Sequence, residues 1–549
     1  MSLNLVNLQF FTLPAGVIAR LHPVIPRKTA TVPFDIYNYD YLFNDSKTVK
    51  MIRNGETIGC FYIESPAMRN LLKKLDVDTF EMLTAASSVI RPGVAESGMM
   101  QEFIARHHDP SKRKYLVPEM EEVLGDTYGV MIYQEDVIKV VHHIAGLSLE
   151  EADLLRRAMS GKMRSHTAMQ VLTEKFYESC RGKGFSDEIS KELWRQVESF
   201  AGYSFCKAHS ASFALLSYQV AFLKAHYPAE FMSSVLTNQG GFYSPAVYIE
   251  EAKRMGLKIK LPCINKSVYE YTGCGDTIRI GFLAIKHFPR ASADIIIEER
   301  NKYGLFKSLP DFLVRTKPGY EETVWLIKCG AMDCFKETRP TLLRMLDIYY
   351  HKMKIHNDAY SDLFMNESFE LLENVKSDYD YSLKEKCLAE YESFDYMVTR
   401  HPLHFYSQWL DHPAVIKAAD MKKHNGKKIR MIGWYMTSKR ISTKKGDLMK
   451  FLSLEDLTGT FEAVIFPNVY SSVAEKTLSM GPYIVEGKAD DNNLVVSRLD
   501  ILAEQDIKVE FRKDSAETIY KPDDEGIREE DFNLSKVIDV EKLRRAYVA

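Results

Sequence analysis

The hydrophobic period changes along the chain, and the change divides the sequence into two kinds of structure. From Gly55 to about Ala229, apolar residues recur at spacings of three and four, the period of helices that bury one face. From Lys427 to about Ala503 they alternate with a period of two, which is typical of strands. We therefore predict a mainly α-helical region followed by a small β-barrel. Its five predicted strands are residues 429–434, 449–454, 461–466, 483–487 and 494–498.

Length and charge exclude several classes of protein. At about 100 to 200 residues per domain, 549 residues imply several domains. The 72 lysines and arginines are balanced by 75 acidic residues, so any contact with nucleic acid must come from local basic patches. The eight cysteines form neither a CxxC pair nor a cluster at zinc spacing, which favours free thiols. No apolar run approaches the roughly 20 residues that span a bilayer, so we expect a cytoplasmic protein without a membrane partner.

Local patterns give some acidic residues and glycines a structural role. Asp78 with Glu81, and Ser148 with Glu151, have the spacing of the capping box, in which a side chain and the backbone satisfy each other at a helix start. Between residues 258 and 336 we expect short helices joined by glycine-containing turns. Two such turns are residues 273–275 and 329–331.

A basic cluster lies in residues 152–162. Arg156, Arg157 and Lys162 are near one predicted helix end, and arginine forks bind phosphate oxygens in pairs, so the cluster suits a triphosphate or a nucleic-acid backbone. The alternative is a solvated helix face on which the arginines pair with Glu150 and Glu151. Spacing alone favours this alternative.

A second candidate segment, residues 200–210, places Tyr203, Lys207 and His209 around a glycine turn. Aromatic faces stack on bases, and a neighbouring basic side chain meets phosphate. The alternative is a buried turn with a satisfied histidine, which this segment alone favours.

A third candidate is a basic loop between two predicted barrel strands, where such barrels commonly bind single strands. An ordinary soluble hairpin explains it equally well. Its basic residues are Lys439, Arg440, Lys444 and Lys445.

Paired carboxylates are required for two-metal phosphoryl transfer. Two Asp-x-Asp pairs occur, at residues 76–78 and 378–380. Capping explains the first pair, and the second lies in a polar stretch rather than on an apolar strand. We therefore predict that neither pair is catalytic and that this chain holds no metal site.

Taken together, an ordered series of motifs resembles the alpha subunit of bacterial DNA polymerase III, the C-family replicative polymerase. The resemblance runs from about Gly55 to Leu502 and implies a multidomain chain, mainly α-helical and followed by an OB-fold barrel. Its landmarks are residues 58–65, 90–93 with 97–99, 127–135, 154–159, 200–210 and 223–231.

In that family this region is the fingers domain, which receives the incoming deoxynucleoside triphosphate and part of the primer-template. The resemblance implies that Arg156 and Arg157 contact the triphosphate, with Arg91, Lys162 and Lys207 as further phosphate contacts. It places Tyr203 against the nascent base pair and His209 as the gate against a ribose 2′-hydroxyl.

Further parts of the resemblance concern DNA and protein partners. Residues 281–297 and 326–333 resemble a helix-hairpin-helix region that grips duplex phosphates, with Lys328 as a DNA contact, although the first turn, residues 286–289, lacks glycine. The barrel resembles the family's domain for single-stranded template. Asp362, Leu363 and Phe364 fall where the family docks on the sliding clamp, with Tyr360 in place of the expected glutamine.

The resemblance also implies an organisation and an activity. The family's PHP and palm domains would precede Met1, so Mg²⁺ is expected in the palm and not on this chain alone. The intact polypeptide would be a DNA-directed DNA polymerase with primer-template, dNTPs, the sliding clamp and other replisome subunits as partners, whereas this chain alone would be inactive. The alternatives are a non-catalytic DNA-binding fragment or accessory subunit, and a structural adaptor that binds no DNA. The expected segments are 1–54 (link from palm to fingers), 55–257 (fingers), 258–345 (helix-hairpin-helix region), 346–424 (connector with the clamp motif), 425–505 (OB-fold) and 506–549 (acidic tail).

Overall fold

The computed structural model describes residues 35–90, 98–159, 166–199, 206–355, 375, 379–443, 445–490 and 493–502. The chain divides into two units, Met1–Tyr227 and Pro228–Ala549. Helices dominate up to residue 424, and a closed barrel follows, which confirms the predicted fold class. Among the described helices, none has both the length and the apolar character needed to cross a membrane.

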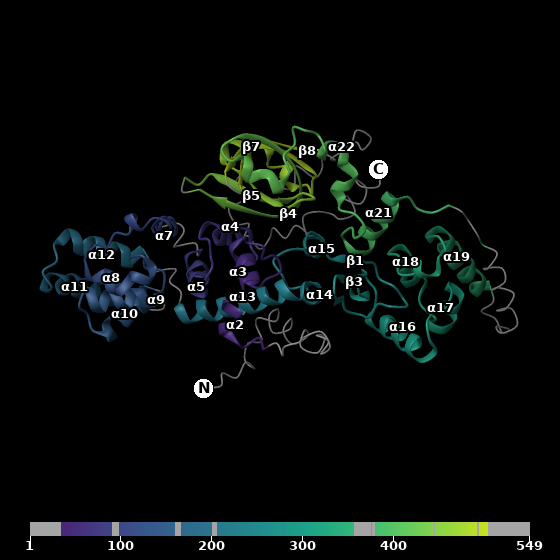
Figure 1. Ribbon diagram of the computed structural model, residues 1–549, viewed down its shortest axis with the longest axis horizontal. Coiled ribbons are helices and arrows are strands. Elements are labelled where there is room, and N and C mark those ends of the chain that lie inside the picture. The colour runs from purple at the N-terminus through teal and green to yellow at the C-terminus, as the bar shows by residue number, and fades with distance from the viewer. Residues whose placement is uncertain are drawn as a thin grey trace. The chain divides into compact units, whose positions relative to one another are not determined.

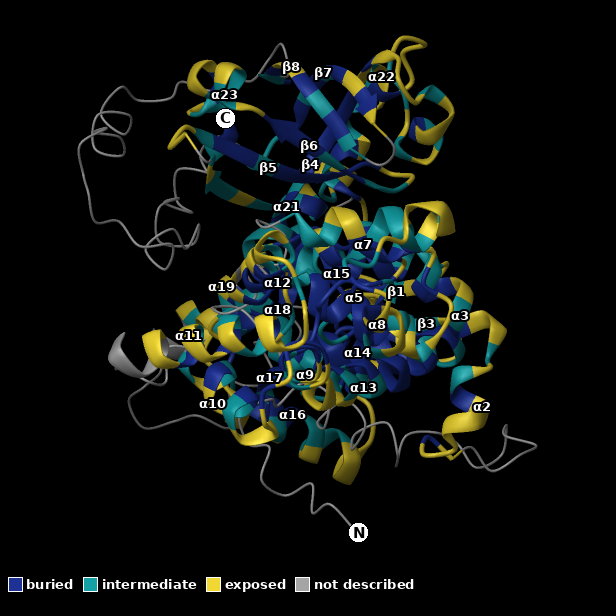
Figure 2. Cartoon of the chain, turned by 90° about the vertical axis from the view of Figure 1, so that its left-hand side faces the viewer, coloured by how far each residue is buried: buried dark blue, intermediate teal, exposed yellow. Residues whose placement is uncertain are grey.

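The first unit is helical throughout its described part (Figure 1). Its longest helix, α13 (Lys207–His226), packs against α5 (Phe80–Val89) and α3 (Ser46–Arg53), and its second half is almost entirely buried. By contrast, α2 (Tyr39–Phe43) is largely exposed (Figure 2). The other helical elements are α4 (Pro66–Lys74), α7 (Met99–His108), η2 (Pro110–Lys112), α8 (Glu119–Leu124), η3 (Gly125–Thr127), α9 (Gln134–Lys139), the π-helical turn η4 (Val140–Ile144), α10 (Leu149–Met159), α11 (His166–Gly182) and α12 (Asp187–Ser199).

The motif at residues 58–65 forms a compact turn that α13 holds in place. Gly59 has a φ of 85°, a conformation that favours glycine, and its N–H donates to the buried Glu64 carboxylate at 2.8 Å. The ammonium of Lys224, which is buried in α13, donates to the carbonyl oxygens of Glu56 and Ile58 at 2.8 Å each. The motif therefore has a structural role, because it satisfies a buried lysine.

One of the two predicted capping boxes is confirmed. The Ser148 N–H donates to Glu151 at 3.0 Å, and the Glu151 N–H donates to the Ser148 hydroxyl at 3.2 Å. The prediction for Asp78 is wrong, because the adjacent Thr79 accepts the Met82 N–H at the start of α5.

In the second unit the helices are joined by a small sheet that the periodicity did not predict. Strands β1 (Lys258–Lys260) and β2 (Thr272–Cys274) flank β3 (Thr277–Arg279), parallel and antiparallel to it. Residues 273–275 were expected to join helices; instead they belong to β2 and the turn after it. A Cβ on Gly273 would lie 2.0 Å from the Ala229 carbonyl oxygen, so this strand requires glycine there.

The remaining helices of the second unit surround this sheet or follow it along the chain (Figure 1). Helix α14 packs against β2 and β3, and α18 packs against α19 and α21. Helix α21 lies inside the segment predicted as a connector. The elements are α14 (Pro228–Asn238), α15 (Pro245–Arg254), η5 (Phe282–Ala284), α16 (Arg290–Tyr303), α17 (Leu309–Thr316), α18 (Tyr320–Lys328), η6 (Asp333–Phe335), α19 (Arg339–Ile355), α21 (Leu383–Phe394), η7 (Pro402–Tyr406), α22 (Ser407–Leu410) and η8 (Ala418–His424).

The turn between α18 and α19 is locked by a buried arginine. Arg339, which is 3% exposed, donates to the two carboxylate oxygens of Asp333 at 3.0 and 2.8 Å and to the Lys328 carbonyl oxygen at 2.9 Å. Gly330 makes room for this arginine, because it has a φ of 81° and a Cβ there would lie 2.3 Å from the guanidinium. The predicted turn at residues 329–331 is confirmed.

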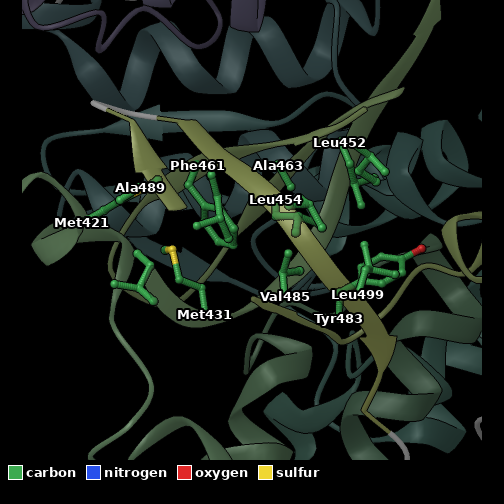
Figure 3. Packing of buried hydrophobic residues seen from close by; sticks show 14 of the residues in the cluster. Met421, Met431, Leu452, Leu454, Phe461, Ala463, Tyr483, Val485, Ala489 and Leu499 are labelled. Atoms are coloured by element: carbon green, nitrogen blue, oxygen red, sulfur yellow. The ribbon is translucent and has the colours of Figure 1, made fainter. Parts of the chain in front are cut away.

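The described part of residues 428–501 forms a closed barrel, in which all five predicted strands are present. The strand order is β4-β5-β6-β8-β7; β6 and β8 pair in parallel, and the other neighbours are antiparallel. Side chains from every strand fill the interior, including Met431, Leu454 and Val485 (Figure 3). The strands are β4 (Lys428–Ser442), β5 (Leu448–Glu455), β6 (Thr460–Ile465), β7 (Tyr483–Asp490) and β8 (Asn493–Ile501), with α23 (Pro467–Val473) and η9 (Lys476–Leu478) between β6 and β7.

A buried carboxylate at the end of β5 joins the barrel to α15. Glu455 is 2% exposed and accepts a hydrogen bond from Arg254 at 2.7 Å. On the other side, Nε2 of the buried His401 lies 3.6 Å from the second carboxylate oxygen. Burial alone would raise the pKa of Glu455, but His401 and the charge of Arg254 outweigh it and the pKa is lowered. The carboxylate is therefore ionised at neutral pH.

Candidate nucleotide and DNA interface

The two arginines of α10 share one carboxylate. Arg156 donates to one oxygen of Asp153 through Nε and Nη2, at 2.9 and 2.6 Å, and Nη2 of Arg157 lies 2.7 Å from the other oxygen. These hydrogen bonds, that from Arg156 first, lower the pKa of Asp153. Glu151, which was one of the expected partners, instead pairs with Lys175. The three charged groups together keep a net positive charge.

The start of α9 connects this pair to the start of α13. The side-chain oxygen of Gln134 accepts a hydrogen bond from Arg156 Nη1 at 3.1 Å, and Glu135 accepts one from the Lys207 backbone N–H at 2.9 Å. The Lys207 ammonium lies 5.2 Å from the centre of the Tyr133 ring. Two predicted site residues that are distant in the sequence are thus attached to consecutive residues of one helix.

A buried carboxylate fixes the start of α9. Asp136 accepts the N–H groups of Ile132 and Tyr133 at 2.9 Å each. Burial raises the pKa of Asp136 to about 6, although these hydrogen bonds and the nearby lysines 139 and 207 oppose the shift. With this cap in place, the side chains of Gln134 and Glu135 have a rigid base.

His209 lies in the first turn of α13 on an aromatic cluster. Its ring centre is 4.1 Å from that of Phe213, which in turn contacts Tyr62 at 4.8 Å and Phe61 at 5.4 Å. His209 itself is exposed, and the turn of the alternative, residues 200–205, lies outside the described residues. The imidazole therefore packs on the Phe213 ring and is accessible to solvent.

The basic loop of the barrel joins β4 and β5. Lys439 and Lys445 are exposed and Arg440 is half-buried. The turn closes through a hydrogen bond from the Thr443 N–H to the Asp447 carbonyl oxygen at 2.8 Å. The exposed lysines therefore lie on a hairpin. Both interpretations, a DNA-binding loop and an ordinary soluble hairpin, predict this geometry.

Sequence reasoning missed a buried lysine beside this loop. Lys450 of β5 is paired in register with Arg440 of β4, and its ammonium donates to the carbonyl and hydroxyl oxygens of Thr477 at 3.0 Å each. Burial, together with the charge of Arg440, lowers the pKa of Lys450 to about 8. A charged residue inside the apolar strand segment 449–454 was the available signal.

Lys328, the predicted DNA contact of the helix-hairpin-helix region, pairs with a carboxylate and an aromatic ring of its own unit. Its ammonium lies 3.0 Å from Glu392 of α21 and 5.6 Å from the centre of the Trp325 ring. In the first turn, Lys286 also reaches the end of α21, where it pairs with Asp395. A DNA phosphate would have to displace an ion pair to bind Lys328.

Several predicted site residues lie outside the described residues, and the structure gives no position for them. They are Arg91, Lys162, Tyr203, Lys444, Asp362, Leu363 and Phe364.

The acidic residues that the structure describes do not gather into a metal-binding group. Asp76 and Asp78 both pair with Arg53, at 3.0 and 2.8 Å, and Asp380 pairs with Lys386. Over the described ranges there is no cluster of three or more His, Cys, Asp or Glu side chains that could hold a metal ion. These residues do not fit the Mg²⁺ of a polymerase palm, and we assign no metal-dependent step to them.

Comparison with known proteins identifies the class to which these features belong. Residues 17–184 match the finger domain of the bacterial DNA polymerase III alpha subunit, and residues 256–342 match the helix-hairpin-helix motif. Helices α9 and α10 lie within the first match and the locked turn between α18 and α19 within the second, whereas α13 lies between the two matches.

Longer proteins are similar to most of the chain. The chain is 33% identical to the DNA polymerase III subunit alpha of Aquifex aeolicus (strain VF5) over 492 residues, which are 88% of this chain and 41% of that protein. It is also 33% identical to the subunit of the same name from Staphylococcus aureus (strain MRSA252) over 488 residues, 86% of this chain and 44% of the relative. Over most of its own length the chain is thus similar to bacterial DNA polymerase III alpha subunits, and it spans less than half the length of these relatives.

Proposed function

We propose that this chain is the fingers and DNA-binding part of a replicative DNA polymerase, which binds the incoming dNTP and the primer-template. The observation that carries the proposal is the attachment of Arg156 and Lys207 to the start of α9. Phosphate recognition requires cationic side chains held in fixed positions, and the helix start supplies that support.

The two arginines have different roles in this proposal. Arg156 is 21% exposed and makes hydrogen bonds to both Asp153 and Gln134, so it positions the cluster. Arg157 is 57% exposed and shares Asp153, so its guanidinium is the one that a triphosphate reaches. In this proposal Lys207, at the exposed start of α13, supplies the second phosphate contact, and the exposed His209 of the same turn meets the sugar.

The chemistry belongs to the whole polypeptide. In nucleotidyl transfer the primer 3′-hydroxyl attacks the α-phosphate of the dNTP, and Mg²⁺ ions held by carboxylates stabilise the developing charge. We propose that this chain contributes binding and positioning, that the carboxylates lie elsewhere in the polymerase, and that the protein acts in the cytoplasm with a sliding clamp and other replisome subunits. The second candidate, a DNA-binding accessory subunit, is favoured by the pairing of Asp76 and Asp78 with Arg53.

The binding test compares variants of the 549-residue chain at the two proposed triphosphate contacts. Arg157→Ala and Lys207→Ala should each weaken binding of a labelled dNTP to the chain with its primer-template, measured by fluorescence anisotropy across a salt series, because each removes a cationic phosphate contact. The weakening should be smaller at high salt, which screens exposed charges. The control is Arg195→Ala on α12, an exposed arginine that also pairs within its helix, with Glu192 at 2.6 Å. If Arg157→Ala and Lys207→Ala both bind the dNTP like the unaltered chain and the control, the proposed interface is wrong.

Primer extension separates the two candidate functions. We expect the chain with Mg²⁺ and dNTPs to bind the primed template without extending it. Incorporation of a nucleotide would show that metal-binding carboxylates lie within this chain. Extension restored by adding the separately expressed remainder of a polymerase would favour the replicase part over the accessory subunit.

A further inference from the structure

We propose that Cys263 and Cys334 form a redox-reactive dithiol, which hydrogen peroxide converts to an internal disulfide. All eight cysteines lie among the described residues, and all are free thiols. These two are distant in the sequence, because Cys263 lies near the start and Cys334 near the end of the predicted helix-hairpin-helix segment 258–345.

Backbone and side-chain contacts hold the two cysteines together. The Ile264 N–H donates to the Ala331 carbonyl oxygen at 3.0 Å, which pairs the two chain segments next to the cysteines. The Asn265 amide nitrogen lies 3.7 Å from the Cys334 sulfur, and the Cys334 thiol lies 4.0 Å from the Ala331 carbonyl oxygen, which also accepts the Ile264 N–H. The segments that carry the two cysteines are therefore held side by side, and each thiol shifts the pKa of the other.

The segment that carries Cys263 is rigid. Asn265 exchanges two hydrogen bonds with the backbone of Phe306, both at 2.8 Å. The Arg300 guanidinium donates to the carbonyl oxygens of Ile264 and Ser267 at 2.7 and 2.9 Å. These contacts fix the backbone that directly follows Cys263.

Exposure and charge distinguish the two thiols. Cys263 is 8% exposed, whereas Cys334 is exposed. The interaction with Cys334, opposed by burial and supported by the charges of Arg279 and Lys266, lowers the pKa of Cys263. Cys263 is thus the more acidic thiol of the pair, and we assign it as the attacking thiolate.

The reaction balances in two steps. The Cys263 thiolate attacks one oxygen of hydrogen peroxide, the O–O bond breaks, and a hydroxide leaves and takes up a proton, which gives a sulfenic acid and water. The Cys334 sulfur then loses its proton and attacks the Cys263 sulfur, and the S–O bond breaks with release of a second water. Two thiols are oxidised by two electrons in total, and one peroxide is reduced to two waters.

Two other cysteines of the same unit differ from the proposed pair in burial or in surroundings. Cys329 is completely buried, and burial raises the pKa of its thiol to about 12, so it is unreactive. Cys274 is exposed on β2 of the same unit. It therefore serves as a matched control for simple accessibility.

The test uses the full 549-residue chain treated with a small excess of hydrogen peroxide, followed by alkylation, proteolysis and mass spectrometry without reduction. We expect a peptide that joins Cys263 to Cys334 within one chain and disappears on treatment with dithiothreitol. Cys274→Ser should give the same peptide, and Cys334→Ser should give a trapped sulfenic acid at Cys263 and no internal link. Complete separate alkylation of Cys263 and Cys334 at a dose that oxidises Cys274 would overturn the proposal, as would links only between chains.

A charge variant tests which sulfur reacts first. Lys266 is exposed, so Lys266→Gln removes a nearby positive charge without touching the core. The linked peptide should form several-fold more slowly at neutral pH, with the same final yield. An unchanged rate would overturn the assignment of Cys263 as the attacking thiolate.

Discussion

At the scale of the single residue, the buried charge of Glu455 should contribute strongly to the free energy of unfolding of the second unit. Glu455→Gln preserves the size of the side chain but removes the nearer of the two carboxylates that pair with Arg254, at 2.7 Å against 3.3 Å for Glu251, which should lower the free energy of unfolding by about 3 kcal/mol. The control is Glu486→Gln on β7, since Glu486 pairs with the more exposed Arg430 and its loss should cost at most about 1 kcal/mol. Urea midpoints of the two variants check this, and equal midpoints would contradict it.

Glu455 should also make the free energy of unfolding depend on pH in the acidic range. The folded-state pKa of Glu455 lies below the ordinary value of 4.5, so its contribution is complete above about pH 4.5 and is lost as the pH falls through the lower folded value. The difference in urea midpoint between the unaltered chain and Glu455→Gln should therefore shrink only in that acidic range.

Lys450 gives the opposite dependence at alkaline pH. The folded state holds this lysine with a pKa of about 8, against 10.5 in the unfolded chain. Between these values the unfolded chain binds more protons, so stability should rise with pH, by about 3 kcal/mol in all. Lys450→Met should abolish this rise in urea unfolding series at pH 8 to 10.5, whereas Lys439→Met, on the exposed side of β4, should retain it. A rise that persists in Lys450→Met would refute the explanation.

The residues of the site show how far local sequence could predict it. Asp153 lies three positions before Arg156, so a helical spacing rule could have paired them. Nothing local predicts that Gln134 reaches Arg156 or that Glu135 reaches the Lys207 backbone, because both contacts form only when separate helices pack. Asp78 was assigned to a cap for the same reason, since its partner Arg53 lies on another helix.

At the scale of the element, the turn between α18 and α19 depends on a glycine. Gly330→Ala combines a left-handed φ with a clash against Arg339, and it should destabilise the chain by more than the roughly 1–2 kcal/mol that the conformation alone costs. Gly256→Ala is the matched control, because Gly256 has a φ of 85° but no heavy atom within 4 Å of the added methyl group. Thermal midpoints measure the difference, and equal losses would contradict the proposed clash.

Elements with a clear period were predictable, and those made by close backbone contact were not. The barrel strands alternate over five or more residues each, and all of them formed as expected. The sheet of β1, β2 and β3 has strands of three residues, which are too short for a period to appear. Its position depends on Gly273 lying against Ala229, a contact that the sequence does not encode locally.

At the scale of the whole molecule, the two units should unfold separately. Calorimetry should resolve two transitions, because each unit has its own buried core. Lys224→Met leaves the Glu56 and Ile58 carbonyls without their buried donor and should lower only one transition. Glu455→Gln should lower only the other. A single transition that both variants shift equally would contradict this.

The strand order of the barrel sets the order in which it can be completed during synthesis. The last strand, β8, inserts between β6 and β7, so both of those strands keep an unpaired edge until the ribosome has released residues 493–501. Open strand edges are templates for pairing with other chains. The nascent barrel is therefore exposed to aggregation until its final strand emerges, and truncations that end before Asn493 would keep that exposure permanently.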